Sequence, residues 1–282
     1  MARLGGADRA KLSAMGAGVL GARERRRLEP LAAALDRAAR PGLPRLEPVA
    51  GSLGPDLRTP SPRTARAGLL AGTFNPFTRA HAALAVAGHR AGCEPVVLAM
   101  APVSLTKEGL ERAHPVDRLD WVRSWARRHP WAVVAVASHP LLVDMAEALA
   151  RATGAEVALL LGADKAAQLV EARWYHDPAA AMERLDRAAW LLVAERAGHP
   201  IPNLPVRAVR LPTAAWVPER SATEARAAAS QGLALDGLLP AAVARAVERT
   251  GAYDMGPSYL ARARELDALS GHRRPGPTDR RR

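Results

Sequence analysis

Short apolar runs alternate with longer segments of helical periodicity from Ala67 onward. Most of the runs are apolar throughout, which is typical of strands that are buried on both faces of a parallel sheet. The pattern predicts strands at 68–71, 95–100, 132–137, 157–161, 190–194 and 206–211. It predicts helices near 79–91, 116–129, 141–153, 165–172, 178–187, 223–231 and 240–249. Strands separated by helices indicate an α/β fold with helices on both faces of the sheet.

The chain before Ala67 has a different character. Residues 22–40 are predicted to form a basic helix that is interrupted near Pro30. Residues 41–66 are rich in proline and indicate a linker. We therefore expect three parts, which are a basic, proline-rich extension at 1–66, one domain at 67–255 and a basic tail at 256–282.

The net charge of the chain is +12, but it is concentrated at the two ends. Residues 1–66 carry a net charge of +7 and residues 271–282 carry +4, which leaves +1 for residues 67–270. A nucleic-acid-binding domain would carry its charge on the folded body, so this distribution disfavours a nucleic-acid partner. No aromatic residue interleaves the charges of the two ends, so we expect solvated tails.

Cysteine usage and hydropathy indicate a cytoplasmic protein with no membrane partner. The chain has one cysteine, Cys93, which excludes an internal disulfide framework and a cysteine-based zinc site. No run of 18 apolar residues exists. The mildly apolar segment 12–22 is mostly Ala and Gly and is a poor match to a signal peptide. The histidines show no metal-ligand spacing, so we expect no protein-built metal site.

The first motif is the segment Gly72–His81, with the sequence GTFNPFTRAH, between a predicted strand and a predicted helix. Ligands of parallel sheets bind beyond the carboxyl ends of the strands, where this turn lies. Gly72 would let the backbone approach a phosphate closely. Thr78 and His81 would share one face of the first helical turn, where both can donate hydrogen bonds to an anion. The alternative is a structural corner in which Thr78 only caps the helix.

The second motif is the segment Ser221–Arg226, with the sequence SATEAR, at the start of a predicted helix. Ser221 and Glu224 fit a capping box, and capping alone would explain them. Thr223 adds a second hydroxyl, and Arg226 lies one turn further along, where its guanidinium can bind a phosphate as a fork. The two motifs together favour a phosphate-binding site.

These motifs resemble signatures of the HxGH/TxGH nucleotidyltransferase superfamily, which are GTFDPxHxGH and ISSTxxR. Three further segments resemble the nicotinate/nicotinamide mononucleotide adenylyltransferases within it. Leu161-Gly162-Ala163-Asp164 is similar to their GxD, Trp174-Tyr175 resembles their Trp-Tyr pair, and Lys107 matches a basic residue after the second strand. The resemblance covers about 67–253 and implies a Rossmann-like parallel sheet.

The resemblance implies adenylyl transfer from ATP to a pyridine mononucleotide, with release of pyrophosphate, as in NAD biosynthesis. The implied catalytic residues are His81, Thr78 and Arg226. The ATP and its phosphates would be bound by Gly72, Thr73, Phe74, Ser221, Thr223 and Asp164. Lys107 and Trp174 would bind the acceptor, with Trp174 stacked on the pyridine ring. Mg²⁺ would be bound mainly through the ATP phosphates.

Four positions depart from the family pattern, namely Asn75, Thr78, Ala80 and Ala222. Phosphopantetheine adenylyltransferases have Thr at the position of Thr78, which keeps a phosphopantetheine or another phosphate acceptor as an alternative. A second alternative is a nucleotide-binding regulator that kept the fold and lost turnover. The choice between nicotinate and nicotinamide mononucleotide stays open, as does formation of a homo-oligomer.

Overall fold

The computed structural model describes residues 20–49, 66–101, 113–169, 171, 174–195, 200–211 and 221–271. Lys107, the expected acceptor-binding lysine, lies outside the described residues, as do 1–19, 50–65 and 272–282 of the two basic ends.

A seven-stranded sheet forms the centre of the described chain. Its strand order is β1-β4-β3-β2-β5-β6-β7, and every neighbouring pair is parallel except β1 and β4. The strands are β1 (Leu46–Pro48), β2 (Arg66–Gly72), β3 (Val96–Met100), β4 (Ala132–Ala137), β5 (Glu156–Gly162), β6 (Ala189–Ala194) and β7 (Ala208–Arg210). The chain runs outward from β2 to β4 and then crosses back to β5 beside β2. This reversal creates a topological switch point between β2 and β5, where ligands of such sheets bind.

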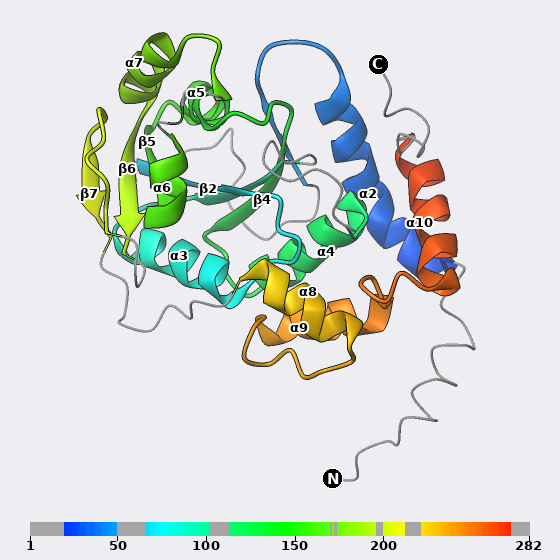
Figure 1. Cartoon of the computed structure of the whole chain (residues 1–282). Coiled ribbons are helices and arrows are strands. Elements are labelled where there is room, and N and C mark those ends of the chain that lie inside the picture. The colour runs from blue at the N-terminus through cyan, green and yellow to red at the C-terminus, as the bar shows by residue number, and fades with distance from the viewer. Residues whose placement is uncertain are drawn as a thin grey trace.

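Helices cover both faces of the sheet, as the sequence predicts (Figure 1). Alternate strand residues point to opposite faces, so Leu70 belongs to one core cluster and its neighbour Leu69 to the other. One face packs against α2 (Ala22–Ala39), α3 (Arg79–Arg90), α4 (Pro115–Ala126), α8 (Ala222–Ser230), α9 (Ala241–Thr250) and α10 (Pro257–Ser270). The other packs against α5 (Leu142–Thr153), α6 (Ala163–Leu169) and α7 (Pro178–Ala188).

The expected extension at 1–66 contributes two elements to the folded body. Helix α2 continues through Pro30 and buries Leu28 and Leu31 completely in the core formed with α4 and α10. Strand β1 pairs with β4 at the edge of the sheet, with Leu46 opposite Ala137. The sequence boundary at residue 66 therefore does not separate these elements from the domain.

The expected tail at 256–282 begins with a helix, α10, that lies beside α2 (Figure 1). The carboxylate of Asp117, at the start of α4, is 1% exposed on its side chain and accepts hydrogen bonds from Arg262 of α10 at 2.8 Å. Arg262 also pairs with Glu24 of α2 at 2.9 Å. Burial alone would lower the pKa of Arg262, but Asp117 and Glu24 outweigh it and raise that pKa. These ion pairs fix α10 and α2 against α4.

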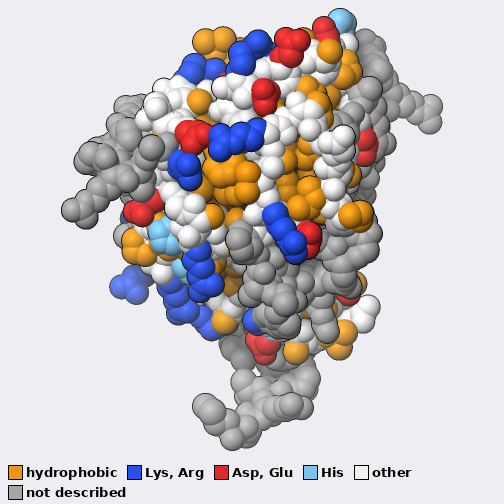
Figure 2. All heavy atoms as spheres, turned by 90° about the vertical axis from the view of Figure 1, so that its left-hand side faces the viewer, with side chains coloured by type: hydrophobic (Ala, Val, Ile, Leu, Met, Phe, Trp, Pro, Cys, Tyr) orange, Lys and Arg blue, Asp and Glu red, His pale blue; other side chains and the backbone are white. Residues whose placement is uncertain are grey.

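The surface seen from the β7 side carries mixed charges. Figure 2 shows apolar side chains near the middle of this face, bordered by basic and acidic groups, and basic side chains gathered toward its lower left. Within the described ranges, every helix is too short or too polar to cross a lipid bilayer.

Candidate functional site

Two glycines mark the carboxyl ends of the strands that flank the switch point. Gly72 ends β2 and leads into the first motif, and Gly162 ends β5 and leads into α6. Strands β2 and β5 pair directly, with Leu69 opposite Leu159, so the two loops leave the sheet side by side. The candidate site is built where these loops meet the N-terminus of α3.

The side chain of His81 reaches back to the start of α3. Its Nδ1 atom accepts a hydrogen bond from the backbone amide of Thr78 at 3.0 Å. Thr78 Oγ1 lies 2.9 Å from the same Nδ1 and also accepts from the His81 amide at 3.4 Å. Because Nδ1 acts as an acceptor, the proton of the neutral ring belongs on Nε2. The arrangement leaves Nε2–H as the donor for a ligand.

Aromatic rings hold the imidazole of His81 in place. The ring stacks on Phe77 with 5.6 Å between centroids and meets Phe74 edge-on at 5.3 Å. Desolvation lowers the pKa of His81 to about 4, while the carboxylate of Asp164 acts in the opposite direction. His81 is therefore neutral at pH 7.

Thr78 and Phe74 both have structural positions in this turn. Thr78 is 2% exposed and forms the N-terminal capping box of α3 with His81, which is the capping role that the sequence left open as an alternative. Phe74 is 1% exposed, with a positive φ of 45°, and its ring lies 2.9 Å from where a Cβ on Gly72 would stand. This ring fills the space beside Gly72. A phosphate could therefore contact the backbone of Phe74 but not its side chain.

Asp164 folds back over the end of β5. A Cβ on Gly162 would stand 2.7 Å from Asp164 Oδ1, so the glycine gives the carboxylate its room. The charge of Asp164 acts on His81, which brings the second loop to the first motif. The sequence analysis placed Asp164 in this site, and the structure brings it there.

Arg226 joins the second motif to the first. Its guanidinium donates to the backbone oxygen of Asn75 at 2.8 Å and to Thr223 Oγ1 at 3.0 Å. Ser221 and Glu224 form the expected capping box of α8, with the Ser221 amide 2.7 Å from Glu224 Oε2. The N-terminus of α8 consequently lies beside the β2–α3 turn, with the Thr223 hydroxyl and the Asn75 carbonyl bound to the same guanidinium.

Three residues that the sequence analysis did not assign to the site hold this turn. Arg118, buried in α4, donates to the backbone oxygen of Thr73 at 2.8 Å. Tyr253 donates its hydroxyl to Asn75 Oδ1 at 2.9 Å, and burial raises the pKa of Tyr253, so it keeps its proton. The amide of Ala113 also donates to Asn75 Oδ1, at 3.3 Å. Sequence patterns do not indicate these contacts, because each of them joins residues that lie far apart along the chain.

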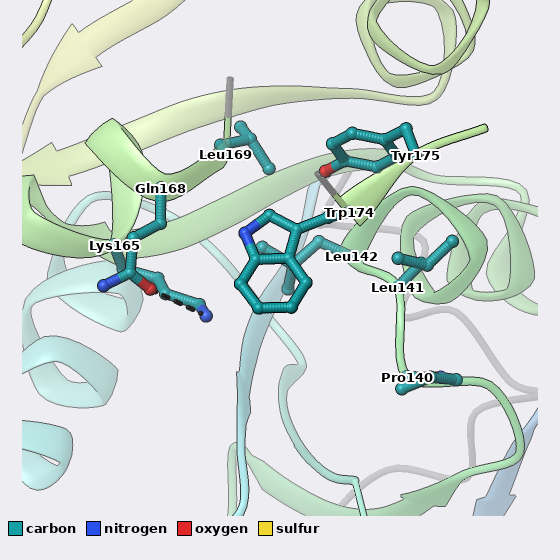
Figure 3. Close-up of a pocket in the computed structure, with 8 residues that line it drawn as sticks. All are labelled: Pro140, Leu141, Leu142, Lys165, Gln168, Leu169, Trp174 and Tyr175. Atoms are coloured by element: carbon teal, nitrogen blue, oxygen red, sulfur yellow. Dashed lines mark hydrogen bonds between the residues drawn. The ribbon is translucent and has the colours of Figure 1, made fainter. Parts of the chain in front are cut away.

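Trp174 lines a pocket beside α6 that does not include His81 or Thr78. The pocket is lined by Pro140, Leu141, Leu142, Lys165, Gln168, Leu169, Trp174 and Tyr175. Figure 3 shows the indole pointing into it, between Leu142 and the pair formed by Lys165 and Gln168, whose polar atoms are 3.3 Å apart. Helix α6 thus contributes Asp164 to the His81 site and Lys165 to this pocket.

The described residues contain no group of three or more His, Cys, Asp and Glu side chains that could hold a metal ion. Among the residues placed at the switch point, Asp164 supplies the carboxylate. One carboxylate together with substrate phosphates is a common donor set for Mg²⁺. The residues present therefore fit a magnesium ion that arrives with a phosphate ligand.

Comparisons with known proteins identify the fold. No protein-family model and no curated protein matches the chain. Among solved structures, nicotinic acid mononucleotide adenylyltransferase from Plasmodium falciparum complexed with NaAD matches with a TM-score of 0.52 and 12% identity. The match covers 68% of this chain and 98% of that chain. The same enzyme complexed with APC gives a TM-score of 0.49 and 13% identity over 68% of this chain and 98% of that one. At this identity the first match shows a shared Rossmann-like fold.

Proposed function

We propose that this chain transfers the adenylyl group of ATP to the phosphate of a pyridine mononucleotide and releases pyrophosphate. The observation that carries the proposal is the Thr78–His81 hydrogen bond, because it fixes a neutral Nε2–H donor at the switch point. The acceptor phosphate is already an anion, so the reaction needs no general base. Positioning and charge stabilisation then provide most of the catalysis.

His81 would act on the α-phosphate of ATP. As negative charge builds on an α-phosphate oxygen, Nε2–H would donate a hydrogen bond to it. A pKa of about 4 keeps the ring neutral, and the contacts with Phe74 and Phe77 keep it oriented before the substrate arrives. A donor that is already oriented needs no reorganisation during the reaction.

The N-terminus of α8 would bind the β- and γ-phosphates. Arg226 uses two of its donors on Asn75 and Thr223, and the guanidinium has further N–H groups for a phosphate. The Ser221 and Thr223 hydroxyls would donate to the same anion, which also gains from the positive end of the helix. Pyrophosphate is thereby stabilised as the leaving group. Mg²⁺ carried by the triphosphate would neutralise phosphate charge, with Asp164 as its protein partner directly or through water.

The Trp174 pocket supports a flat acceptor over a phosphopantetheine arm. An indole face offers stacking area to an aromatic cation, whereas an extended pantetheine chain has no ring to place there. Lys165, on the same wall, would supply positive charge. This support rests on the shape and chemistry of the pocket and leaves nicotinate and nicotinamide as two acceptors to be compared.

One assay tests the proposal. The purified full chain is incubated with ATP, Mg²⁺ and one acceptor at a time. The acceptors are nicotinate mononucleotide, nicotinamide mononucleotide and phosphopantetheine, and one reaction contains no acceptor. Pyrophosphate and the dinucleotide product are both measured. We expect equal amounts of the two products with a pyridine mononucleotide and none without an acceptor. ATP binding without pyrophosphate release for any acceptor would instead identify a nucleotide-binding regulator.

A further inference from the structure

A basic pocket lies where the end of α4 meets α9, away from the residues of the His81 site. It is lined by Ser124, Arg127, Arg128, Ala242, Arg245 and Arg249 and has a volume of about 240 Å³. Helices α4 and α9 pack against each other, so arginines from the end of α4 and from α9 line the same pocket. Their grouping around one pocket distinguishes them from the scattered arginines of the surface.

The four arginines lack acidic partners among the described residues. The two acids of α4 are occupied elsewhere, since Asp120 pairs with Arg27 and Arg123, and Asp117 pairs with Arg262. Glu248, the one acid of α9, forms no ion pair with a described residue. Other helical arginines do find carboxylates, as Arg184 does with Asp144 and Glu147 at 2.8 and 2.7 Å. The pocket therefore concentrates uncompensated positive charge.

Helix dipoles account for part of this cluster but not for all of it. Arg127 is the C-cap of α4, and Arg249 lies in the last turn of α9, where a positive charge is favoured. Arg245 lies in the middle of α9 and gains nothing from a helix end. Ser124 Oγ donates to the backbone oxygen of Trp121 at 2.7 Å, so the guanidinium groups are the donors that the pocket offers to a ligand.

We propose that this pocket binds a polyphosphate anion, with two or more linked phosphate groups. Guanidinium forks bind phosphate oxygens in pairs, and four of them match an anion with several negative charges better than a single phosphate. The concave shape favours a compact anion over a duplex, whose backbone needs an extended row of charges. No aromatic side chain lines the described pocket, which removes the stacking that single-stranded nucleic acids use. The proposal does not depend on the proposed function.

The test measures binding of inorganic tripolyphosphate to the full chain by calorimetry. The pocket variant carries Arg127→Gln and Arg245→Gln. The control variant carries Arg23→Gln and Arg264→Gln, which remove the same charge from exposed positions on α2 and α10. We expect the pocket variant to bind about tenfold or more weakly and the control to bind like the wild type. All four positions are exposed, so thermal unfolding should confirm that both variants fold.

Binding at the His81 site is separated by repeating the titration in the Arg226→Gln protein, where the pocket affinity should persist. Equal affinity in the pocket and control variants, or equal weakening in both, would overturn the proposal. Loss of all binding in Arg226→Gln would assign the anion to the other site. Equally tight binding of orthophosphate would contradict the need for linked phosphates. A short DNA duplex that displaces tripolyphosphate, and whose binding requires Arg127 and Arg245, would identify a nucleic-acid surface instead.

Discussion

The Nδ1 atom of His81 lies 3.0 Å from the backbone nitrogen of Thr78, three residues earlier on the same helical turn. One ring nitrogen therefore holds the start of α3, and the other is left for a ligand. Helix capping and phosphate binding use different atoms of one side chain, so substitutions can separate them.

Replacing His81 with Gln should keep the cap and lose the activity. Glutamine at this position of a capping box accepts a hydrogen bond from the N-cap amide. The free energy of unfolding of His81→Gln should therefore lie within about 0.5 kcal/mol of the wild-type value. His81→Ala should lose about 1–2 kcal/mol of unfolding free energy. Both variants should release pyrophosphate about 10²–10³ times more slowly, because Ala has no donor and the amide N–H of Gln lacks the ring contacts with Phe74 and Phe77 that orient the imidazole donor. Urea unfolding and a pyrophosphate assay measure the two effects, and a fully active His81→Gln protein would contradict the proposed role.

Acid should destabilise the wild type more than His81→Gln. The pKa of His81 is about 4 in the folded protein and about 6.5 when unfolded, so the unfolded state binds more protons between these values. The contribution of neutral His81 is complete above about pH 6.5 and is lost as the pH falls toward about 4. Between pH 7 and pH 5 the wild type should lose about 2 kcal/mol more than the variant. An equal loss of unfolding free energy in the two proteins between pH 7 and pH 5 would contradict the lowered pKa of His81.

Arg226→Lys should weaken ATP use while the fold persists. Lysine cannot bridge Asn75 O and Thr223 Oγ1 with one planar group, although it keeps the charge. We expect kcat/KM for ATP to fall about tenfold to a hundredfold, as lost charge-assisted hydrogen bonds imply. Arg264→Lys, at an exposed position of α10, serves as the control and should match the wild type. Equal kcat/KM values for ATP in Arg226→Lys and Arg264→Lys would show that Arg226 does not take part in binding ATP.

Trp174→Ala should raise KM for the pyridine mononucleotide and leave KM for ATP unchanged. Stacking of a base on an aromatic side chain contributes about 1–3 kcal/mol, which corresponds to roughly 5-fold to 150-fold in affinity. Trp174→Phe should recover part of the loss, because it keeps an aromatic face. An equal rise of both KM values would indicate a structural role for Trp174.

Arg262→Ala should destabilise the protein by about 3–5 kcal/mol, since it leaves the buried carboxylate of Asp117 without its cation. The double variant Asp117→Asn with Arg262→Met should recover much of this loss, because neither charge remains. Arg25→Ala removes a more exposed ion pair between α2 and α10, with Glu265, and should cost about 0–1 kcal/mol. Chemical unfolding compares the three variants, and equal losses for Arg25 and Arg262 would show that burial does not set the cost.

The central sheet was predictable because each buried strand has a local signature. The predicted strand at 132–137 coincides with β4, and the others agree with the observed bounds to within two residues at each end. The inner strands reach that accuracy because burial on both faces leaves few polar positions within them, whereas β7, at the edge of the sheet, is exposed and ends with Arg210.

The added elements were not predictable in the same way. Strand β1 has three residues and ends with a proline, and its pairing with β4 is a tertiary contact that no local pattern encodes. Helix α10 buries Arg262 and Tyr259 among its apolar residues, which blurs the periodicity of its inner face. The segment expected to be a basic tail from residue 256 onward therefore begins with a helix whose Arg262 takes part in an internal ion pair.

The site was predicted as a set of residues but not as a set of contacts. Sequence spacing placed Thr78 and His81 on one helical face, and the structure agrees. It left the capping role of Thr78 as an alternative, and it could not show that Arg226 binds the carbonyl of Asn75, 151 residues away. Such contacts depend on the tertiary arrangement, which spacing along one helix does not determine.

The packing of α2 against α10 affects the order in which the chain can become stable during synthesis. The amide of Leu20 donates to Glu265, 245 residues later, so the ribosome makes the two partners at well-separated times. Until α10 has left the exit tunnel, the buried face of α2, with Leu28 and Leu31, lacks part of its cover. A nascent chain arrested before residue 257 would therefore leave that apolar surface available to chaperones and proteases.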